Sequence, residues 1–146
     1  MQHVAIHTEN MADEARARAI HELPPGTQAI YATWVVDAEV NNGGFNQFFF
    51  NPSGQFAGLA LSGYELMGAE EYARVMRAAI ATYESERDTL APFHRDRSLE
   101  SFSESYRHTS LGEIDQRYYS LGDHIYNLWA IFVKKRPELF ASQTDT

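Results

Sequence analysis

The chain has 146 residues, of which 44% are hydrophobic and 13% aromatic, and this length and composition suit a single folded domain. The absence of cysteine excludes disulfides, thiolate catalysis and cysteine-based metal sites. A net charge of −8, from 20 acidic and 12 basic residues, disfavours direct binding to nucleic acid. The sequence has no visible secretion signal and no apolar run near the ~20 residues of a membrane span, so we expect a cytoplasmic protein without membrane association.

Helical patterns begin near the start of the chain. Residues 11–21 predict a first helix, with Asn10 as its N-cap and Pro24 just beyond its end. In residues 27–40 apolar side chains recur with a period of 3.6, which predicts a second helix with one broad buried stripe. The stripe consists of Ile30, Tyr31, Trp34, Val35 and Ala38.

Residues 39–52 carry the most distinctive pattern, and we expect the rest of the chain to pack around them. The Asn-Asn-Gly-Gly run at 41–44 suits a helix end and a turn, with one of the two glycines at positive φ. We expect the amides of Asn41 and Asn42 to bond the unpaired backbone groups of this turn. A short helix follows that ends before Pro52, because phenylalanines fall at i, i+3 and i+4 in positions 45, 48 and 49.

Two helices are predicted next along the chain. Residues 56–67 place small and apolar side chains on one face, where Gly63 permits close contact with another helix, and Gly68 ends the segment. Residues 69–84 are strongly amphipathic, and this is the clearest helical pattern in the chain. Its predicted inward side chains are Tyr72, Val75, Met76, Ala79, Ile80 and Tyr83.

The pattern weakens in residues 85–110, which contain Pro92 and few aliphatic side chains, so we expect a loop there with a short helix near 99–106. Helical periodicity resumes at 111–119 and 123–133. The second of these helices has a predicted core face made of Ile125, Leu128, Trp129, Phe132 and Val133.

Pro137 ends the last helix, and we expect Leu139 and Phe140 to fold back on the core while residues 141–146 fray. No segment alternates with period 2, and no internal repeat is present. The sequence therefore predicts an all-α protein, a single irregular bundle of about six or seven helices spanning residues 1–146.

The sequence gives only weak support for a catalytic or metal-binding site. His3 and His7 have helical spacing for zinc but lack further ligands. The Asn-Gly-Gly run at 42–44 lacks the lysine of a phosphate-binding loop. An acid–base group is conceivable from Asp115, Tyr118, Tyr119 and His124, although paired tyrosines are typical of packing edges. We therefore assign no catalytic residue, no metal site and no cofactor.

Negative charge is concentrated in the first half of the chain. Residues 1–73 hold nine acidic and two basic residues, against eleven and ten in residues 74–146. The charge imbalance is compatible with ordinary solubility, but it also predicts a negative surface that attracts a basic partner. The leading candidates for such a partner-binding surface are Asp37, Glu39, Glu65, Glu70 and Glu71.

A family resemblance rests on the central motif. Its residues are Glu39, Asn42, Gly43, Gly44, Phe45, Gln47, Phe48, Phe49 and Asn51. This pattern resembles the signature of a bacterial domain family of mostly unknown function, whose characterised member is an acidic DNA-mimic protein. The resemblance covers roughly residues 27–140 and implies an all-α fold, binding to the DNA-reading surface of a transcriptional repressor, and a homodimer as one option for assembly. The motif residues themselves resemble a structural element.

Three functional hypotheses follow. The first is an acidic protein-binding module that mimics DNA on the basic surface of a regulator, because rows of carboxylates on a helix can imitate a patch of phosphates. The second is an immunity-type inhibitor of a basic toxin. The third is a small enzyme that uses a polar cluster, composed of Asn41, Asn42, Asn46 and Gln47 with Glu39 or Asp115.

Overall fold

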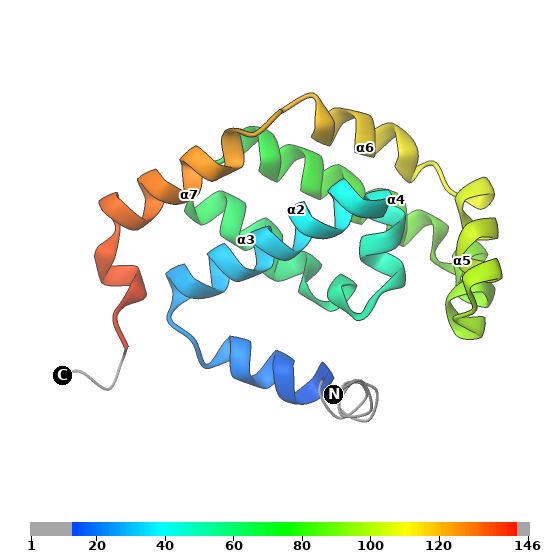
Figure 1. The fold of residues 1–146 in the computed structure, drawn as a ribbon, viewed down its shortest axis with the longest axis horizontal. Helices are drawn as coiled ribbons and strands as arrows, with labels where there is room; N and C mark the ends of the chain where they lie inside the picture. Colours follow the sequence, from blue (N-terminus) through cyan, green and yellow to red (C-terminus); the bar gives the residue numbers. More distant parts are fainter. Residues whose placement is uncertain (1–12, 143–146) are drawn as a thin grey trace.

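The computed structural model describes residues 13–142, which contain seven α-helices, three short 3-10 segments and no strand (Figure 1). The α-helices are residues 13–21, α2 (Pro25–Phe50), α3 (Ala57–Leu66), α4 (Glu70–Asp96), α5 (Leu99–Ser105), α6 (Leu111–Tyr119) and α7 (His124–Lys135). The 3-10 segments are η1 (Pro52–Phe56), η2 (Tyr106–His108) and η3 (Pro137–Phe140). The predicted all-α bundle of six or seven helices is confirmed.

Helix α2 is the element around which the others are arranged. It contacts α3, α4, α5, α6, η1 and η3, and Figure 1 shows it running through the middle of the molecule. Ala32, Val36 and Val40 are fully buried along its length, because this face of the helix meets several neighbours. Trp34 and Ala38 of the predicted stripe are exposed, so the prediction of the buried face is wrong at these two positions. The central position predicted for this part of the chain is therefore observed.

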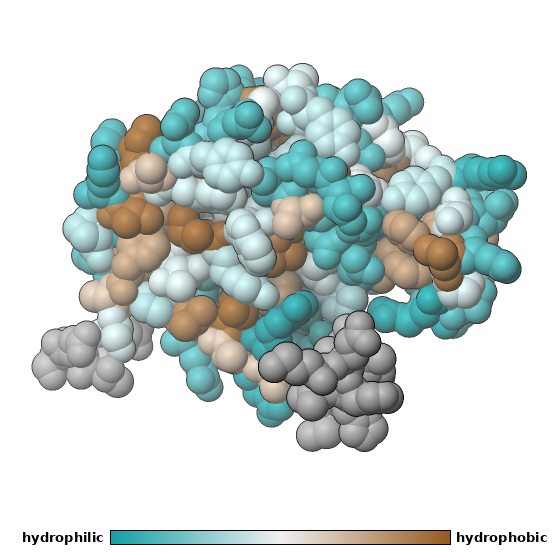
Figure 2. Space-filling model, in the orientation of Figure 1, coloured by the Kyte–Doolittle hydropathy of each residue, from teal (hydrophilic) through white to brown (hydrophobic). Residues whose placement is uncertain are grey.

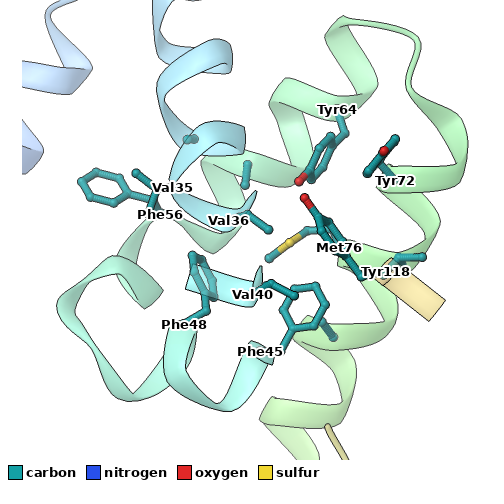
Figure 3. Close-up of a cluster of buried hydrophobic side chains, with 14 of the residues drawn as sticks. Val35, Val36, Val40, Phe45, Phe48, Phe56, Tyr64, Tyr72, Met76 and Tyr118 are labelled. Carbon is teal, nitrogen blue, oxygen red and sulfur yellow. The ribbon is translucent and has the colours of Figure 1, made fainter. Parts of the chain in front are cut away.

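The core is rich in aromatic side chains that meet from α2, α3, α4 and α6 (Figure 3). Phe45 meets Tyr118 edge to face, with ring centroids 5.9 Å apart, and Tyr64 stacks against Tyr72 at 5.6 Å. These geometries are the preferred ones for aromatic pairs. Burial of each large side chain contributes about 1.5 to 3 kcal/mol, so the aromatic cluster fixes how α2 lies against the other helices.

Helices α2 and α3 approach closely at Gly63. A Cβ atom added to Gly63 would lie 3.0 Å from the Cα atom of Ala29, which is too close for an ordinary contact. The absence of a side chain therefore allows the two backbones to touch. The close helix contact predicted for Gly63 is confirmed.

The loop predicted for residues 85–110 is wrong in its first part, because α4 continues to Asp96. Pro92 lies on the exposed side of this helix, and packing on the other side outweighs the hydrogen bond that the proline removes. Leu90 is 1% exposed, and Phe93 stacks on His108 at 4.9 Å. The short helix predicted near 99–106 is present as α5.

Helix α7 partly matches its prediction. Ile125 and Phe132 are buried, but Val133 is 46% exposed, so its assignment to the core is wrong. A helix at the edge of the bundle has only one neighbouring face, and Val133 lies outside it. Figure 2 shows hydrophobic residues on the surface around α7, at the left of the view. Phe140 in η3 packs against Phe132, with centroids 5.4 Å apart, as predicted for the C-terminal fold-back.

Some expectations concern residues outside the described part of the chain. His3 and His7 both lie there, as do residues 143–146 of the segment expected to fray. In residues 13–142 no group of histidines and carboxylates is arranged to hold a metal ion. None of the helices in the same range is long and apolar enough to cross a lipid bilayer.

Candidate functional site

The central motif forms a sharp kink within α2. Gly43 has φ −149° and ψ 16°, and Gly44 has φ 79° and ψ 178°, so neither is helical. Only Gly44 adopts the left-handed range of φ, which glycine enters without the steric cost of a Cβ atom. The prediction that one of the two glycines has positive φ is confirmed. The kink divides α2 into a long first part and a short phenylalanine-rich part.

The start of the second part of α2 is capped by a side chain from α6. The backbone N–H of Phe45 donates a hydrogen bond to Oδ1 of Asp115, with a length of 2.7 Å. A carboxylate at this position satisfies an N–H that has no partner within its own helix and favours the positive end of the helix dipole. Burial raises the pKa of the Asp115 carboxyl, and the bond from Phe45 opposes that shift.

Two tyrosines bind the carbonyl groups left free before the kink. The hydroxyl of Tyr119 donates to the carbonyl of Val40, and the hydroxyl of Tyr106 donates to the carbonyl of Gly43, both at 2.6 Å. The expectation that Asn41 and Asn42 would serve these backbone groups is therefore wrong. Side chains from η2 and α6, distant in the sequence, reach the backbone groups instead.

The asparagine amides bond other side chains. Asn41 donates to Asp37 at 3.1 Å, and Asn42 donates to the side-chain oxygen of Gln47 at 3.1 Å. Both asparagines are exposed. Asn46 differs, because it is 1% exposed and donates to Ser105 in α5 at 2.9 Å.

We expect Asn46→Ala to lower the free energy of unfolding by about 1 to 3 kcal/mol, because it removes a buried hydrogen bond and leaves a small cavity. Asn42→Ala, in the same kink, should cost less than about 1 kcal/mol, since water replaces the partner of an exposed amide. Urea unfolding followed by circular dichroism measures both changes. Equal losses for the two variants would contradict this distinction.

The acidic residue of the motif joins the two parts of α2. Oε2 of Glu39 accepts hydrogen bonds from Gln47 at 2.6 Å and from Asn51 at 3.0 Å. Gln47 is itself held by Asn42, so four motif side chains form one network on the outer side of the kink. This network stands beside a cavity of about 550 Å³, which Glu39 and Asn51 help to line.

Asp37 lies inside the molecule, and it is only 7% exposed. Its Oδ1 accepts a hydrogen bond of 2.6 Å from the hydroxyl of Tyr118, and its Oδ2 accepts one of 3.3 Å from Tyr126. These bonds connect α2 to α6 and α7. The pKa of Tyr118 is raised by burial, and the neighbouring carboxylate acts in the same direction. Asp37 is therefore not available as part of an external partner-binding surface.

The residues considered for acid–base chemistry have separate partners. Asp115 binds the backbone of Phe45, Tyr118 binds Asp37, and Tyr119 binds the carbonyl of Val40. His124 begins α7 and borders a different hollow, next to Tyr72. The four side chains therefore support the packing of helices and do not form a shared proton-transfer group.

Three other acidic candidates lie close together in the chain at the junction of α3 and α4. Glu65, Glu70 and Glu71 are all exposed. Glu65 forms an ion pair of 3.1 Å with Arg77, whereas Glu70 and Glu71 have no ion pair within residues 13–142. The junction therefore presents two carboxylates without a bound cation.

A further carboxylate, Asp123, belongs to the same region and was missed by sequence reasoning. Burial raises the pKa of Tyr72, and the negative charges of Asp37, Asp123 and Glu71 add to this shift. The Tyr72 hydroxyl is hydrogen-bonded to the backbone of Gly122 and Ile125, on either side of Asp123, and Tyr72 follows Glu71 in the chain. No local sequence signal could have revealed this, because Asp123 occurs in the nearly neutral second half.

The helices pack around α2, which is kinked at two glycines, and carboxylates are exposed at the helix junctions. These features define a small acidic all-α module. A family model described as DMP19-like protein matches residues 21–136, and the chain belongs to this family. The name stands for DNA mimic protein 19, in agreement with the family resemblance seen in the motif. No curated protein and no solved structure was found to match the chain.

Proposed function

We propose that this protein is an acidic protein-binding module that occupies the basic DNA-binding surface of a regulator. The observation that carries the proposal is a group of three exposed carboxylates without an ion-pair partner within the described residues. Glu70 and Glu71 line one hollow with Tyr72 and His124, and Asp123 lies next to Gly122, whose carbonyl accepts a hydrogen bond from Tyr72. Family membership supports the same function, because the family is named after a DNA mimic.

The proposed surface imitates a patch of DNA and not a long duplex. DNA carries one negative charge per ~1.7 Å of its axis, a density that three carboxylates match only locally. A second copy of the chain would lengthen the patch in a homodimer. The partner is therefore expected to use a small cluster of lysines or arginines at the centre of its DNA-reading surface.

The test reverses two charges of the proposed surface. We expect Glu70→Lys with Glu71→Lys to slow association with the partner by about tenfold or more at low salt, because electrostatic attraction accelerates encounter. The double variant should lose at most about 1 kcal/mol of stability. This loss comes from the favourable interaction of the two exposed carboxylates with the positive end of the α4 helix dipole. Surface plasmon resonance at about 0.05 M and 0.3 M salt measures the association rate and its screening.

The matched control is Glu100→Lys with Glu104→Lys, which makes the same charge change in the first and last turns of α5. We expect it to alter the association rate much less. The partner for these measurements is a DNA-binding protein recovered on the immobilised chain and released by duplex DNA. Equal effects of the two double variants, or a rate that does not depend on salt, would overturn the proposal.

Competition by DNA separates this function from the alternatives. A basic toxin bound as by an immunity protein would remain bound when duplex DNA is added. The enzyme hypothesis relies on the polar cluster near the kink, where the side chains of Glu39, Gln47 and Asn46 bond one another or neighbouring helices. This bonding pattern favours a scaffold role for the cluster.

A further inference from the structure

A cavity of about 550 Å³ lies beside the kink, a volume typical of sites for small ligands. Residues 13–21, α2, η1 and the end of α4 contribute to its walls. It does not include Glu70, Glu71 or Asp123. Any ligand of this cavity therefore represents a function beyond the acidic surface proposed above.

Opposite charges line this cavity without contacting each other. Glu39 presents a carboxylate whose Oε2 is held by two amides, while its Oε1 accepts no hydrogen bond from residues 13–142. Arg16 and Arg97 also line the cavity, and neither forms an ion pair with a described residue. Arg16 instead lies over the ring of Phe56, 5.4 Å from its centroid. The charged groups are thus positioned around a space that a ligand could bridge.

Arg97 occupies an unusual position in the backbone. Its φ of 56° is the only positive φ of a non-glycine residue in the described chain. Helices commonly end in this left-handed conformation with glycine, because a side chain makes it unfavourable. Arginine at this helix end places a guanidinium group on the cavity wall at the expense of backbone strain, and such strain is concentrated at functional sites.

The cavity also offers an aromatic surface. Trp34 lines it and is 53% exposed, which is unusual for so large an apolar side chain. Tyr31 is its neighbour, with ring centroids 6.3 Å apart, and Phe50 lines the cavity as well. A second hollow of about 310 Å³ adjoins it and shares Phe50, Asn51 and Arg97. A planar apolar group could therefore lie against Trp34 while polar groups reach the charged walls.

The balance of charges selects the chemical class of the ligand. Two arginines and two carboxylates, Asp13 and Glu39, line the cavity. A purely anionic ligand would face both carboxylates, and a purely cationic ligand would face both arginines. We propose that the cavity binds a free aromatic α-amino acid, with its ammonium group on Glu39, its carboxylate on Arg97 and its ring against Trp34.

Three small probes test the proposal on the full chain. They are L-phenylalanine, phenethylamine, which lacks the carboxylate, and 3-phenylpropionate, which lacks the ammonium group. We expect saturable binding of L-phenylalanine by isothermal titration calorimetry, and at least tenfold weaker binding of each analogue, because each loses one charge-assisted contact. Equal binding of the three probes, or no saturable binding of L-phenylalanine, would overturn the proposal.

Two variants assign the contacts. Glu39→Gln should weaken binding of L-phenylalanine and phenethylamine by about tenfold or more, while binding of 3-phenylpropionate should not weaken, because a repelling carboxylate is removed. Arg97→Gly should weaken binding of L-phenylalanine and 3-phenylpropionate, while binding of phenethylamine should not weaken, because a repelling cation is removed. Glycine suits the backbone at this position. Arg107→Gln is the control, because Arg107 is exposed and lines neither hollow. If Arg97→Gly and Arg107→Gln had the same effect on binding, Arg97 would not be the partner of the carboxylate.

Discussion

Gly44→Ala should lower the free energy of unfolding by more than about 4 kcal/mol, a loss that most small domains cannot tolerate. Alanine is strained at a φ of 79°, and its Cβ atom would overlap the carboxylate of Asp115. Asp115 would have to move away, so the backbone N–H of Phe45 would also lose its cap. The larger Gly44→Val should unfold the protein.

Gly68→Ala separates the strain of a positive φ from the overlap with Asp115. Gly68 has a similar φ of 71°, but a Cβ atom there would meet nothing within 4 Å. We expect this control to cost about 1 to 2 kcal/mol, which is the strain of the left-handed conformation alone. Urea unfolding of both variants measures the difference. Similar losses in the two variants would show that the Asp115 contact is unimportant for stability.

Asp37→Ala should be the second most damaging change, with a loss of about 2 to 4 kcal/mol. The substitution removes the acceptor of the buried Tyr118 hydroxyl and of the Asn41 amide. Hydrogen bonds to a charged group contribute about 1.5 to 3 kcal/mol each, and a buried donor left without a partner adds its own penalty. The contacts of α2 with α6 and α7 should loosen together.

A double-mutant cycle with Tyr118→Phe isolates the bond between these side chains. Because removal of both partners avoids an unsatisfied donor, the double variant should be more stable than the sum of the single losses predicts. Equilibrium unfolding of the four proteins gives the coupling free energy. If Asp37→Ala kept full stability and lost only partner binding, Asp37 would belong to the recognition surface after all.

The helices themselves could be predicted because their signals are local. Apolar residues with a period of 3.6 identified α2, α4, α6 and α7, and the two adjacent glycines identified the kink. The end of α4 could not be predicted, because Pro92 suggested a helix break. What extends α4 is contact with later segments, such as the bonds from Thr109 and Ser110 to Glu86. A local pattern contains no information about such partners.

The candidate site was predictable only in part for the same reason. Sequence patterns selected Glu39, Gly44 and Asn51 as members of one motif, but not the bonds that Glu39 makes with the amides. Asp37 looked like a surface acid, because its tyrosine partners come from helices about 80 residues further along. The proximity of Asp123 to Glu71 likewise arises from tertiary packing.

The caps of the kink also determine when α2 can complete its fold during translation. The backbone groups at residues 40, 43 and 45 bond side chains that follow 79, 63 and 70 positions later. At a synthesis rate of about 5 to 20 residues per second, the ribosome needs roughly 3 to 16 s to produce the distant partners. During that interval the backbone groups at the kink of α2 lack their capping side chains. Until α6 has been synthesised, we expect the nascent N-terminal half to expose apolar surface that chaperones recognise.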